Sequence, residues 1–353
     1  MKVLIAAGGT GGHIYPALAI AEKLKEENVD VVFVGTKEGM ESKIVPNAGF
    51  RLLFISTGQF AGKSFTVKAR TLSRVVKGIL DSIAIIKEEK PQAVLGMGSF
   101  VSFPAVVSAI LRGVPSFLHE QNFDLGLTNR VLFRFVKKIF LSFEETAQVY
   151  GIKNYYYTGN PVRRSIKKAP EIEKKEGFSI FVLGGSRGAK SINKALVELL
   201  PIIAPLKNVE IYHQTGEEEY ESIRMAYRKF GIGGEVFPFT RDIEKYYGFS
   251  DLVISRAGSS TLFELASMKK PAILIPYPYS AGKHQWRNAR YVERLGGAYT
   301  IDNGDLSGRS LYEKIESLMS DRERLRIMGE NMGKIYVDDA QDRIFQEIMR
   351  YVK

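Results

Sequence analysis

The residues best suited to chemistry lie in and behind four glycine-containing turns. In chain order these turns are residues 8–13 ("GGTGGH"), 96–100 ("GMGSF"), 184–191 ("GGSRGAKS") and 256–261 ("RAGSST"). Backbone N–H groups in such a turn, together with the positive end of the helix that follows, bind phosphate oxygens. A single turn of this kind is weak evidence, because its glycines can have no role other than a tight connection between a strand and a helix. Four such turns, two in each half of the chain, predict a site for a doubly phosphorylated ligand.

Two side chains near these turns are candidates for a general base. His13 is the last residue of the first turn, and Glu120 lies in the run "FLHEQN". An imidazole with an ordinary pKa near 6.5 can remove a proton from a hydroxyl group at neutral pH, so His13 is the first candidate and Glu120 the second. Two alternatives stay open for His13: it could orient an acceptor molecule, or it could be a structural histidine in the core or at a helix cap.

The composition argues against several other kinds of site. The chain has no cysteine and only four histidines, which excludes disulfides and thiolate metal sites and disfavours a histidine-rich metal centre. No Asp-x-Asp triplet occurs in the sequence, so we expect neither a metal ion nor another cofactor. The first turn does not complete the fingerprint Gly-x-Gly-x-x-Gly, because Ile14 stands in the last glycine position. A nicotinamide-dependent dehydrogenase is therefore disfavoured.

The elements that must position these residues form two similar halves. Residues 4–24 align with residues 180–200, and the glycines of the first turn fall on those of the third. Each segment is an apolar run, a glycine turn and a helical pattern, which is typical of the first strand and helix of a doubly wound parallel sheet. Further strands are expected at 29–35, 92–99, 114–120, 137–143, 209–216, 251–258 and 271–278. The sequence thus predicts an α/β protein with two Rossmann-like, doubly wound parallel-sheet domains that face each other across a cleft.

The length of 353 residues suits two domains. Glycine and proline in "TGNPVRRS", followed by a strongly charged stretch, place the boundary near residue 161. We expect an N-terminal domain at 1–161, a C-terminal domain at 162–335 and a closing amphipathic helix within 336–353. The uncharged segment 93–111 approaches the length of a membrane span, but Gly, Ser and Pro interrupt it. It is predicted to be a buried strand, a loop and the start of a helix.

The net charge of +11 is concentrated locally. From Ser42 to Leu80 the chain has basic residues, Lys68, Arg70 and Arg74 among them, and no acidic residue. Apolar residues alternate with these cations, which is typical of an amphipathic helix. Such a helix could present a solvated basic face, or it could bind an anionic membrane surface. No recognition motif accompanies the charge, so no nucleic-acid partner is expected.

Six segments together resemble the MurG family of bacterial glycosyltransferases. They are "GGTGGHIYPALAIA", "SFLHEQN", "TGNPVR", "LGGSRGA", "RAGSSTLFE" and "HQWRNA", in the family's order, and the resemblance runs from residue 3 to about residue 300. Members of this family transfer N-acetylglucosamine (GlcNAc) from UDP-GlcNAc to undecaprenyl-linked lipid I in peptidoglycan synthesis, which gives lipid II. The resemblance implies the two-domain GT-B fold, with the last helix packed back on the N-terminal domain.

The resemblance also implies roles for individual residues. In the donor site Glu264 would bind the ribose hydroxyls, Thr240 would bind uracil through its backbone, and Asn122 and Gln285 would contact the sugar. The full set of implied UDP-GlcNAc contacts is Thr10, Gly11, Gly12, Asn122, Arg163, Ser186, Thr240, Ser259, Ser260, Thr261, Leu262, Phe263, Glu264 and Gln285. The implied acceptor contacts are Gly9, Gly96, Gly98 and Ser99.

Two segments depart from the family pattern. Phe100 stands where the family typically has tyrosine, which puts in doubt an acceptor hydrogen bond at that position. Ser259, Ser260 and Thr261 stand where relatives often have Ala-Leu-Thr, which adds hydroxyl groups beside the expected diphosphate.

The implied reaction is an inverting, metal-independent transfer to the 4-hydroxyl of the N-acetylmuramoyl unit of lipid I. The enzyme would bind peripherally at the cytoplasmic face of the cell membrane, because its acceptor is lipid-linked. Two alternatives stay open: a related GT-B transferase that acts on another lipid acceptor, and a nucleotide-sugar-binding module without catalytic activity.

Overall fold

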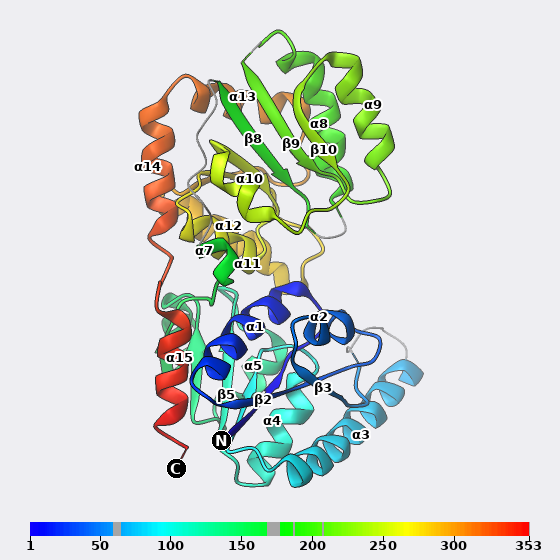
Figure 1. Ribbon diagram of the computed structural model, residues 1–353, viewed down its shortest axis with the longest axis vertical. Coiled ribbons are helices and arrows are strands. Elements are labelled where there is room, and N and C mark those ends of the chain that lie inside the picture. The colour runs from blue at the N-terminus through cyan, green and yellow to red at the C-terminus, as the bar shows by residue number, and fades with distance from the viewer. Residues whose placement is uncertain (59–64, 168–176, 186–187, 207, 353) are drawn as a thin grey trace. The chain divides into compact units, whose positions relative to one another are not determined.

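The computed structural model describes residues 1–58, 65–167, 177–185, 188–206 and 208–352, the side chains of 65–72 excepted. The chain divides into two compact units (Figure 1). The first unit is Met1–Arg163 together with Val337–Lys353, and the second is Arg164–Tyr336. Val162 and Arg163 thus belong to the first unit, whereas the expected boundary near residue 161 put them in the second.

The first unit is built on a seven-stranded sheet in which all paired strands are parallel. Its order is β3 (Arg51–Phe54), β2 (Asp30–Gly35), β1 (Lys2–Ala6), β4 (Ala93–Gly96), β5 (Ser116–Glu120), β6 (Lys138–Leu141) and β7 (Tyr155–Tyr157). Its helices are α1 (Gly11–Glu26), α2 (Glu41–Asn47), α3 (Phe65–Glu89), α4 (Ser102–Leu111), α5 (Leu127–Leu132), α6 (Glu145–Tyr150) and α15 (Ala340–Met349).

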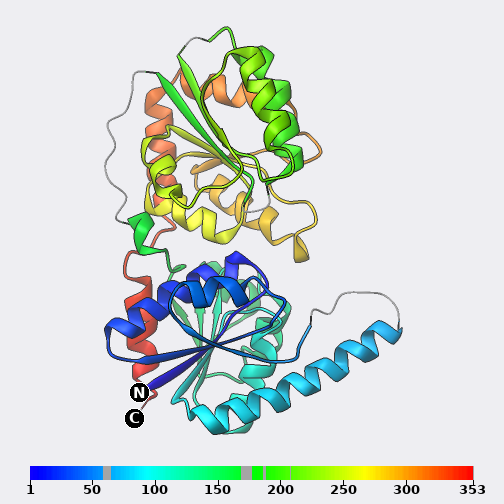
Figure 2. The ribbon, with the colours of Figure 1, turned by 45° about the vertical axis from the view of Figure 1, so that its right-hand side comes forward.

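Helices cover both faces of this sheet, because its strands are apolar on both sides. Val3 and Ile5 of β1 belong to a core cluster with residues of α1 and α15. Leu4 and Ala6 of the same strand belong to a second cluster with residues of α3, α4 and α5. In Figure 2 the long helix α3 lies along the outer side of α4. The expected continuous apolar runs are therefore strands buried on both faces.

The second unit repeats this plan with a six-stranded parallel sheet. Its order is β10 (Gly233–Phe237), β9 (Val209–Gln214), β8 (Phe178–Leu183), β11 (Leu252–Ser255), β12 (Ala272–Leu274) and β13 (Ala298–Thr300). Its helical segments are α7 (Arg164–Lys167), α8 (Lys190–Ile203), α9 (Tyr220–Phe230), α10 (Ile243–Phe249), α11 (Ser259–Ser267), η1 (Ala281–Lys283), α12 (His284–Arg294), α13 (Gly308–Met319) and α14 (Arg322–Gly333).

Each sheet has one point at which the strand order reverses. In the first unit this switch point lies between β1 and β4, and in the second it lies between β8 and β11. The first and second glycine turns follow β1 and β4, and the third and fourth follow β8 and β11. Ligands of open α/β sheets bind at the carboxyl ends of the strands beside such a point. The predicted class of two doubly wound parallel α/β domains is confirmed.

Among the described residues, no helix is both long enough and apolar enough to cross a membrane. The segment 93–111 forms β4, the second turn and α4.

Candidate functional site

The first turn connects β1 to α1 and is shaped by a buried carboxylate. Glu41 is completely buried, and its oxygens accept hydrogen bonds from the backbone N–H of Gly9 at 3.1 Å and from the N–H and hydroxyl of Thr36 at 2.9 and 2.7 Å. A Cβ atom on Gly8 would lie 2.6 Å from the Glu41 carboxylate, so only glycine fits there. Glu41 therefore holds this turn, a role that no motif in the sequence indicated.

Gly9 adopts a positive φ of 88°, a conformation that L side chains rarely take. Its N–H group is occupied by Glu41. The helix α1 starts at Gly11 and Gly12, and Thr10 is its N-cap residue without a side-chain capping hydrogen bond. The backbone N–H groups at the start of helix α1 are thus not capped by the side chain of Thr10, which would otherwise compete with a ligand.

His13 lies in the first turn of α1 and is partly exposed. Its Nδ1 atom lies 2.9 Å from Oε1 of Gln121, which follows β5 and is completely buried. Removal of the ring from water lowers the pKa of His13, and hydrogen bonds to Gln121 and to the backbone of Met97 oppose that shift. His13 is therefore a neutral imidazole at pH 7, which is the form that a general base needs.

A second histidine continues this hydrogen-bond chain inward. His119 is completely buried, and its Nδ1 atom lies 3.0 Å from Nε2 of Gln121. Its Nε2 atom lies 3.4 Å from the carbonyl oxygen of Gly159. Burial lowers the pKa of His119 to about 3. His119 is therefore a neutral, internal member of the network.

Glu120, the second candidate base, has a different environment. Its side chain is buried, and Oε1 accepts hydrogen bonds from the backbone and side-chain amide groups of Asn122 at 3.1 and 3.3 Å. Oε2 accepts hydrogen bonds from the N–H of Gly126 and from Nδ2 of Asn129, both at 2.8 Å. Burial raises the pKa of Glu120, and these hydrogen bonds oppose the rise. The carboxylate ties together the loop between β5 and α5.

The second turn, behind β4, is packed against this loop. Gly98 has a φ of 83°, and a Cβ atom there would lie 2.8 Å from Nδ2 of Asn129. A Cβ atom on Gly96 would lie 2.7 Å from Val106. Ser99 is buried, and its carbonyl oxygen accepts a hydrogen bond from the Thr128 hydroxyl at 3.1 Å. The second turn thus positions the loop that contains Glu120 and Asn122.

In the second unit the fourth turn leads into α11. Gly258 is the N-cap residue, and no side chain caps the helix. Ser259 is buried, and the buried hydroxyl of Ser260 has no hydrogen-bond partner in the structure. Thr261 completes this first helical turn and is partly exposed. Uncapped N–H groups with hydroxyl groups beside them suit phosphate oxygens.

Glu264 lies one turn further into α11 and is buried. One of its carboxylate oxygens lies 3.3 Å from the hydroxyl of Tyr247, which is completely buried. Leu262 and Phe263 are also completely buried, so their side chains contribute to the core. In α11, the groups that can bind a nucleotide are therefore the N–H and hydroxyl groups of its first helical turn and the carboxylate of Glu264.

Gln214, at the end of β9, connects Thr240, a predicted contact of the UDP-GlcNAc donor, to Gly185 of the third turn, and no pattern in the sequence pointed to this role. Its Oε1 accepts a hydrogen bond from the backbone N–H of Thr240 at 3.1 Å, and its Nε2 donates to the carbonyl oxygen of Gly185 at 3.1 Å. The backbone N–H of Thr240 is therefore engaged, and its carbonyl group is the remaining candidate for uracil. Ser186, the predicted phosphate contact in the third turn, lies outside the described residues.

The remaining predicted donor residues are spread over both units. Gln285 opens α12, and its Oε1 accepts a hydrogen bond from the backbone N–H of Tyr277 at 2.9 Å. The guanidinium of Arg163 lies 4.7 Å from the centre of the Tyr15 ring in the first unit. The structure brings His13 together with the end of β5 and the loop behind it within one unit. Within the other unit it places β8 and β11, the strands before the third and fourth turns, side by side.

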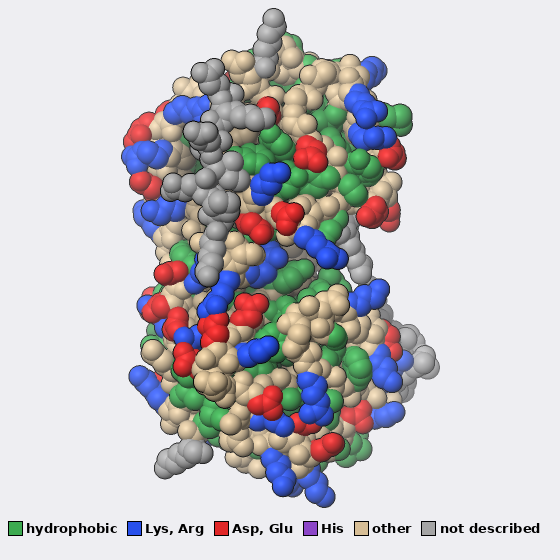
Figure 3. Space-filling view, in the orientation of Figure 1, with side chains coloured by type: hydrophobic (Ala, Val, Ile, Leu, Met, Phe, Trp, Pro, Cys, Tyr) green, Lys and Arg blue, Asp and Glu red, His purple; other side chains and the backbone are tan. Residues whose placement is uncertain are grey.

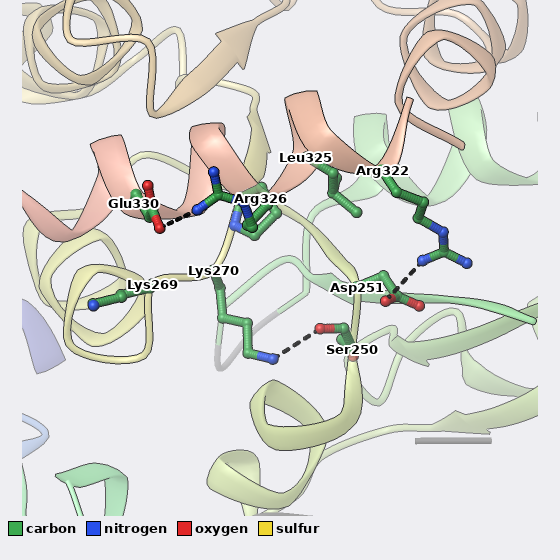
Figure 4. Close-up of a pocket in the computed structure, with 9 residues that line it drawn as sticks. Ser250, Asp251, Lys269, Lys270, Arg322, Leu325, Arg326 and Glu330 are labelled. Atoms are coloured by element: carbon green, nitrogen blue, oxygen red, sulfur yellow. Dashed lines mark hydrogen bonds and ion pairs between the residues drawn. The ribbon is translucent and has the colours of Figure 1, made fainter. Parts of the chain in front are cut away.

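A pocket in the second unit lies away from these residues (Figure 4). Ser250 and Asp251 precede β11, and Lys269 and Lys270 precede β12. The pocket is therefore at the amino ends of the strands, opposite the glycine turns. Nζ of Lys270 donates to the Ser250 carbonyl oxygen at 2.9 Å, and Arg322 lies 3.1 Å from Asp251. None of the predicted site residues lines this pocket.

Two doubly wound domains with glycine turns at both switch points form the architecture of a nucleotide-dependent α/β enzyme. Residues 3–141 match the glycosyltransferase family 28 N-terminal domain, and residues 179–344 match the glycosyltransferase family 28 C-terminal domain. The chain therefore belongs to glycosyltransferase family 28.

Full-length relatives agree with this assignment. The chain is 39% identical to the UDP-N-acetylglucosamine--N-acetylmuramyl-(pentapeptide) pyrophosphoryl-undecaprenol N-acetylglucosamine transferase of Thermodesulfovibrio yellowstonii, over 99% of each chain. It is 38% identical to the transferase of the same name from Geobacter metallireducens, over 99% of this chain and 98% of the relative. The crystal structure of Acinetobacter baumannii MurG matches with a TM-score of 0.82 and 26% identity, over 99% of each chain.

Proposed function

We propose that this protein transfers GlcNAc from UDP-GlcNAc to undecaprenyl-linked lipid I and so forms lipid II for peptidoglycan synthesis. The observation that carries the proposal is the equivalence of the two switch points. The switch point of the first unit has the imidazole of His13 at the end of its first glycine turn. The switch point of the second unit has the uncapped helix α11, with the carboxylate of Glu264 one turn further along the helix. The named activity of relatives that match over the full length supports the choice of donor and acceptor.

The second unit is the proposed donor domain. The first turn of α11, with Ser259, Ser260 and Thr261, would bind the diphosphate oxygens. Glu264 would accept hydrogen bonds from both ribose hydroxyls, which a carboxylate with two oxygens does well. The N–H groups and the helix dipole would stabilise the negative charge that develops on UDP as it leaves.

In the proposed reaction the 4-hydroxyl oxygen of the acceptor sugar forms a bond to the anomeric carbon of GlcNAc. The bond between that carbon and the UDP phosphate oxygen breaks on the opposite face, so the configuration is inverted. UDP leaves with the bonding electron pair, and His13 accepts the hydroxyl proton. The geometry favours His13 over Glu120, because both carboxylate oxygens of Glu120 already accept hydrogen bonds inside the protein.

The first unit is the proposed membrane-binding domain. Exposed apolar side chains lie on its α3, α4 and α5 side, where α3 packs on α4 and α4 packs on α5. They are Val76, Leu80, Leu111, Leu127, Val131 and Phe135, each at least 47% exposed. Arg74, Lys77 and Arg134 are exposed near them in sequence. The side chains of Lys68 and Arg70 lie outside the described residues.

Apolar side chains with cations around them suit a bilayer that contains anionic lipids. On the face of the molecule in Figure 3, lysine and arginine side chains are interspersed with aspartates and glutamates. Peripheral binding at the cytoplasmic face of the membrane would bring the enzyme to its lipid-linked acceptor.

The experiment that tests the proposal measures UDP release from UDP-GlcNAc with and without a lipid I analogue that has a short, soluble chain. We expect release that depends on the acceptor and a disaccharide product, with UDP-glucose and UDP-GalNAc as poor donors. Equal rates with all three donors would contradict the GlcNAc assignment. Binding of UDP-GlcNAc without turnover on this or any other lipid acceptor would indicate a binding module.

A further inference from the structure

The buried amide of Gln121 has an orientation that the surrounding backbone determines. Its Nε2 atom lies 3.2 Å from the carbonyl oxygen of Met97 and 3.3 Å from the carbonyl oxygen of His119. Carbonyl oxygens only accept hydrogen bonds, so the NH₂ group must face them. The amide oxygen then faces His13, at 2.9 Å from Nδ1.

An amide oxygen cannot donate a hydrogen bond, and therefore Nδ1 of His13 must be the donor. A neutral imidazole has one N–H group and one nitrogen with a free electron pair. With the proton on Nδ1, the electron pair is on Nε2. In solution a neutral histidine exchanges between its two tautomers, so this contact selects one of them.

We propose that Gln121 is a positioning residue for the transfer reaction: its amide oxygen keeps the proton of neutral His13 on Nδ1 and makes Nε2 the basic nitrogen. This inference rests on the proposed role of His13 as the base. His119 supports the arrangement from the other side. It donates from Nε2 to the Gly159 carbonyl oxygen, so its Nδ1 is left to accept from the Gln121 amide.

The direct test is the ¹⁵N NMR spectrum of the wild-type protein labelled at histidine. The chain has only four histidines, and the His13→Ala variant assigns the His13 signals by their loss. At neutral pH we expect a pyrrole-type shift for Nδ1 of His13 and a pyridine-type shift for Nε2. The opposite assignment, or two equal averaged shifts in the wild type, would overturn the proposal. This measurement needs no activity and no variant at position 121.

The second test replaces Gln121 with methionine, which has a similar length and no hydrogen-bonding amide. In Gln121→Met we expect the two nitrogen shifts of His13 to converge, because both tautomers become populated. With the soluble acceptor, kcat should fall by about 10- to 100-fold, the effect of losing one buried hydrogen bond at a reacting group. The KM for UDP-GlcNAc should stay within about twofold, since the donor contacts are unchanged.

Asn154→Ala is the matched control, because Asn154 also donates from its side-chain amide to two backbone carbonyl oxygens of the first unit, those of Phe133 and Val136. It should leave kcat and the His13 shifts unchanged. Converged shifts with an unchanged kcat in Gln121→Met would overturn the positioning role. Failure of the proposed function itself has a different signature: the wild type would release no UDP with the soluble acceptor, while the tautomer of its His13 could still be measured. If the function holds but His13 is not the base, His13→Ala would keep full turnover.

Discussion

Acidification should destabilise the first unit through a single buried imidazole. His119 is completely buried and has a pKa of about 3 in the folded protein, whereas an unfolded histidine has a pKa of about 6.5. Above pH 6.5 the residue is neutral in both states, and its contribution to stability is fully present. As the pH falls, the unfolded state binds a proton and the folded state does not, so stability is lost progressively down to about pH 3. Proton linkage gives a loss of about 2 kcal/mol at pH 5.

The assay is urea unfolding followed by far-UV circular dichroism at a series of pH values between 8 and 5. The matched variant is His119→Gln, because glutamine can donate to Gly159 and accept from Gln121 without titrating. We expect the wild type to lose about 2 kcal/mol more than His119→Gln between pH 8 and pH 5. Carboxylates titrate alike in both proteins, so they cancel in this difference. Parallel stability curves for the two proteins would refute the reasoning.

Four further outcomes are expected from the site and the surface. His13→Ala should lower kcat by about 10²- to 10⁴-fold, the range for a lost general base, while the affinity for UDP changes little; a collapse of UDP affinity would place His13 in the donor site. Glu264→Ala should raise the KM for UDP-GlcNAc by about 10- to 100-fold, or about 1.4 to 2.7 kcal/mol, as measured by initial rates; an unchanged KM would remove it from the ribose site. EDTA should leave activity largely intact, and loss that Mg²⁺ or Mn²⁺ restores would contradict the metal-independent reaction. Reversal of Arg74, Lys77 and Arg134 to glutamate should abolish cosedimentation with anionic vesicles and spare turnover of the soluble acceptor; unchanged cosedimentation would move the membrane contact elsewhere.

The inner strands of both sheets could be predicted from the sequence, and the edge strands could not. A strand buried on both faces is a continuous apolar run, as in β1 and β8, and these runs stand out in the sequence. The four strands without a prediction, β3, β7, β10 and β13, are the edges of the two sheets. They are short, and each has side chains that are exposed or partly exposed, as in "GGEVF" of β10. Their apolar signal is therefore weak.

For the candidate site the sequence provides candidates whose roles stay predictions. His13 is a candidate base because its imidazole stands at the end of a phosphate-binding type of turn, and Glu264 is a candidate ribose ligand because of the family resemblance. The supporting residues were not predictable, because their roles depend on contacts distant in sequence. Gln121 contacts His13 across 108 positions. Glu41 belongs to the first turn only because the fold brings α2 beneath it.

The division of the chain has a consequence for the order of events during synthesis. The second unit is one continuous stretch, whereas the first is interrupted and closes with the segment from Val337 onward. In that segment Ile344 and Ile348 of α15 are completely buried in the core cluster that includes α1. Until the segment that contains α15 has been synthesised, the core cluster around α1 therefore lacks the apolar side chains that α15 adds to it. The first unit is therefore begun before the second unit and completed after it, so that its core stays incomplete while the whole second unit is synthesised.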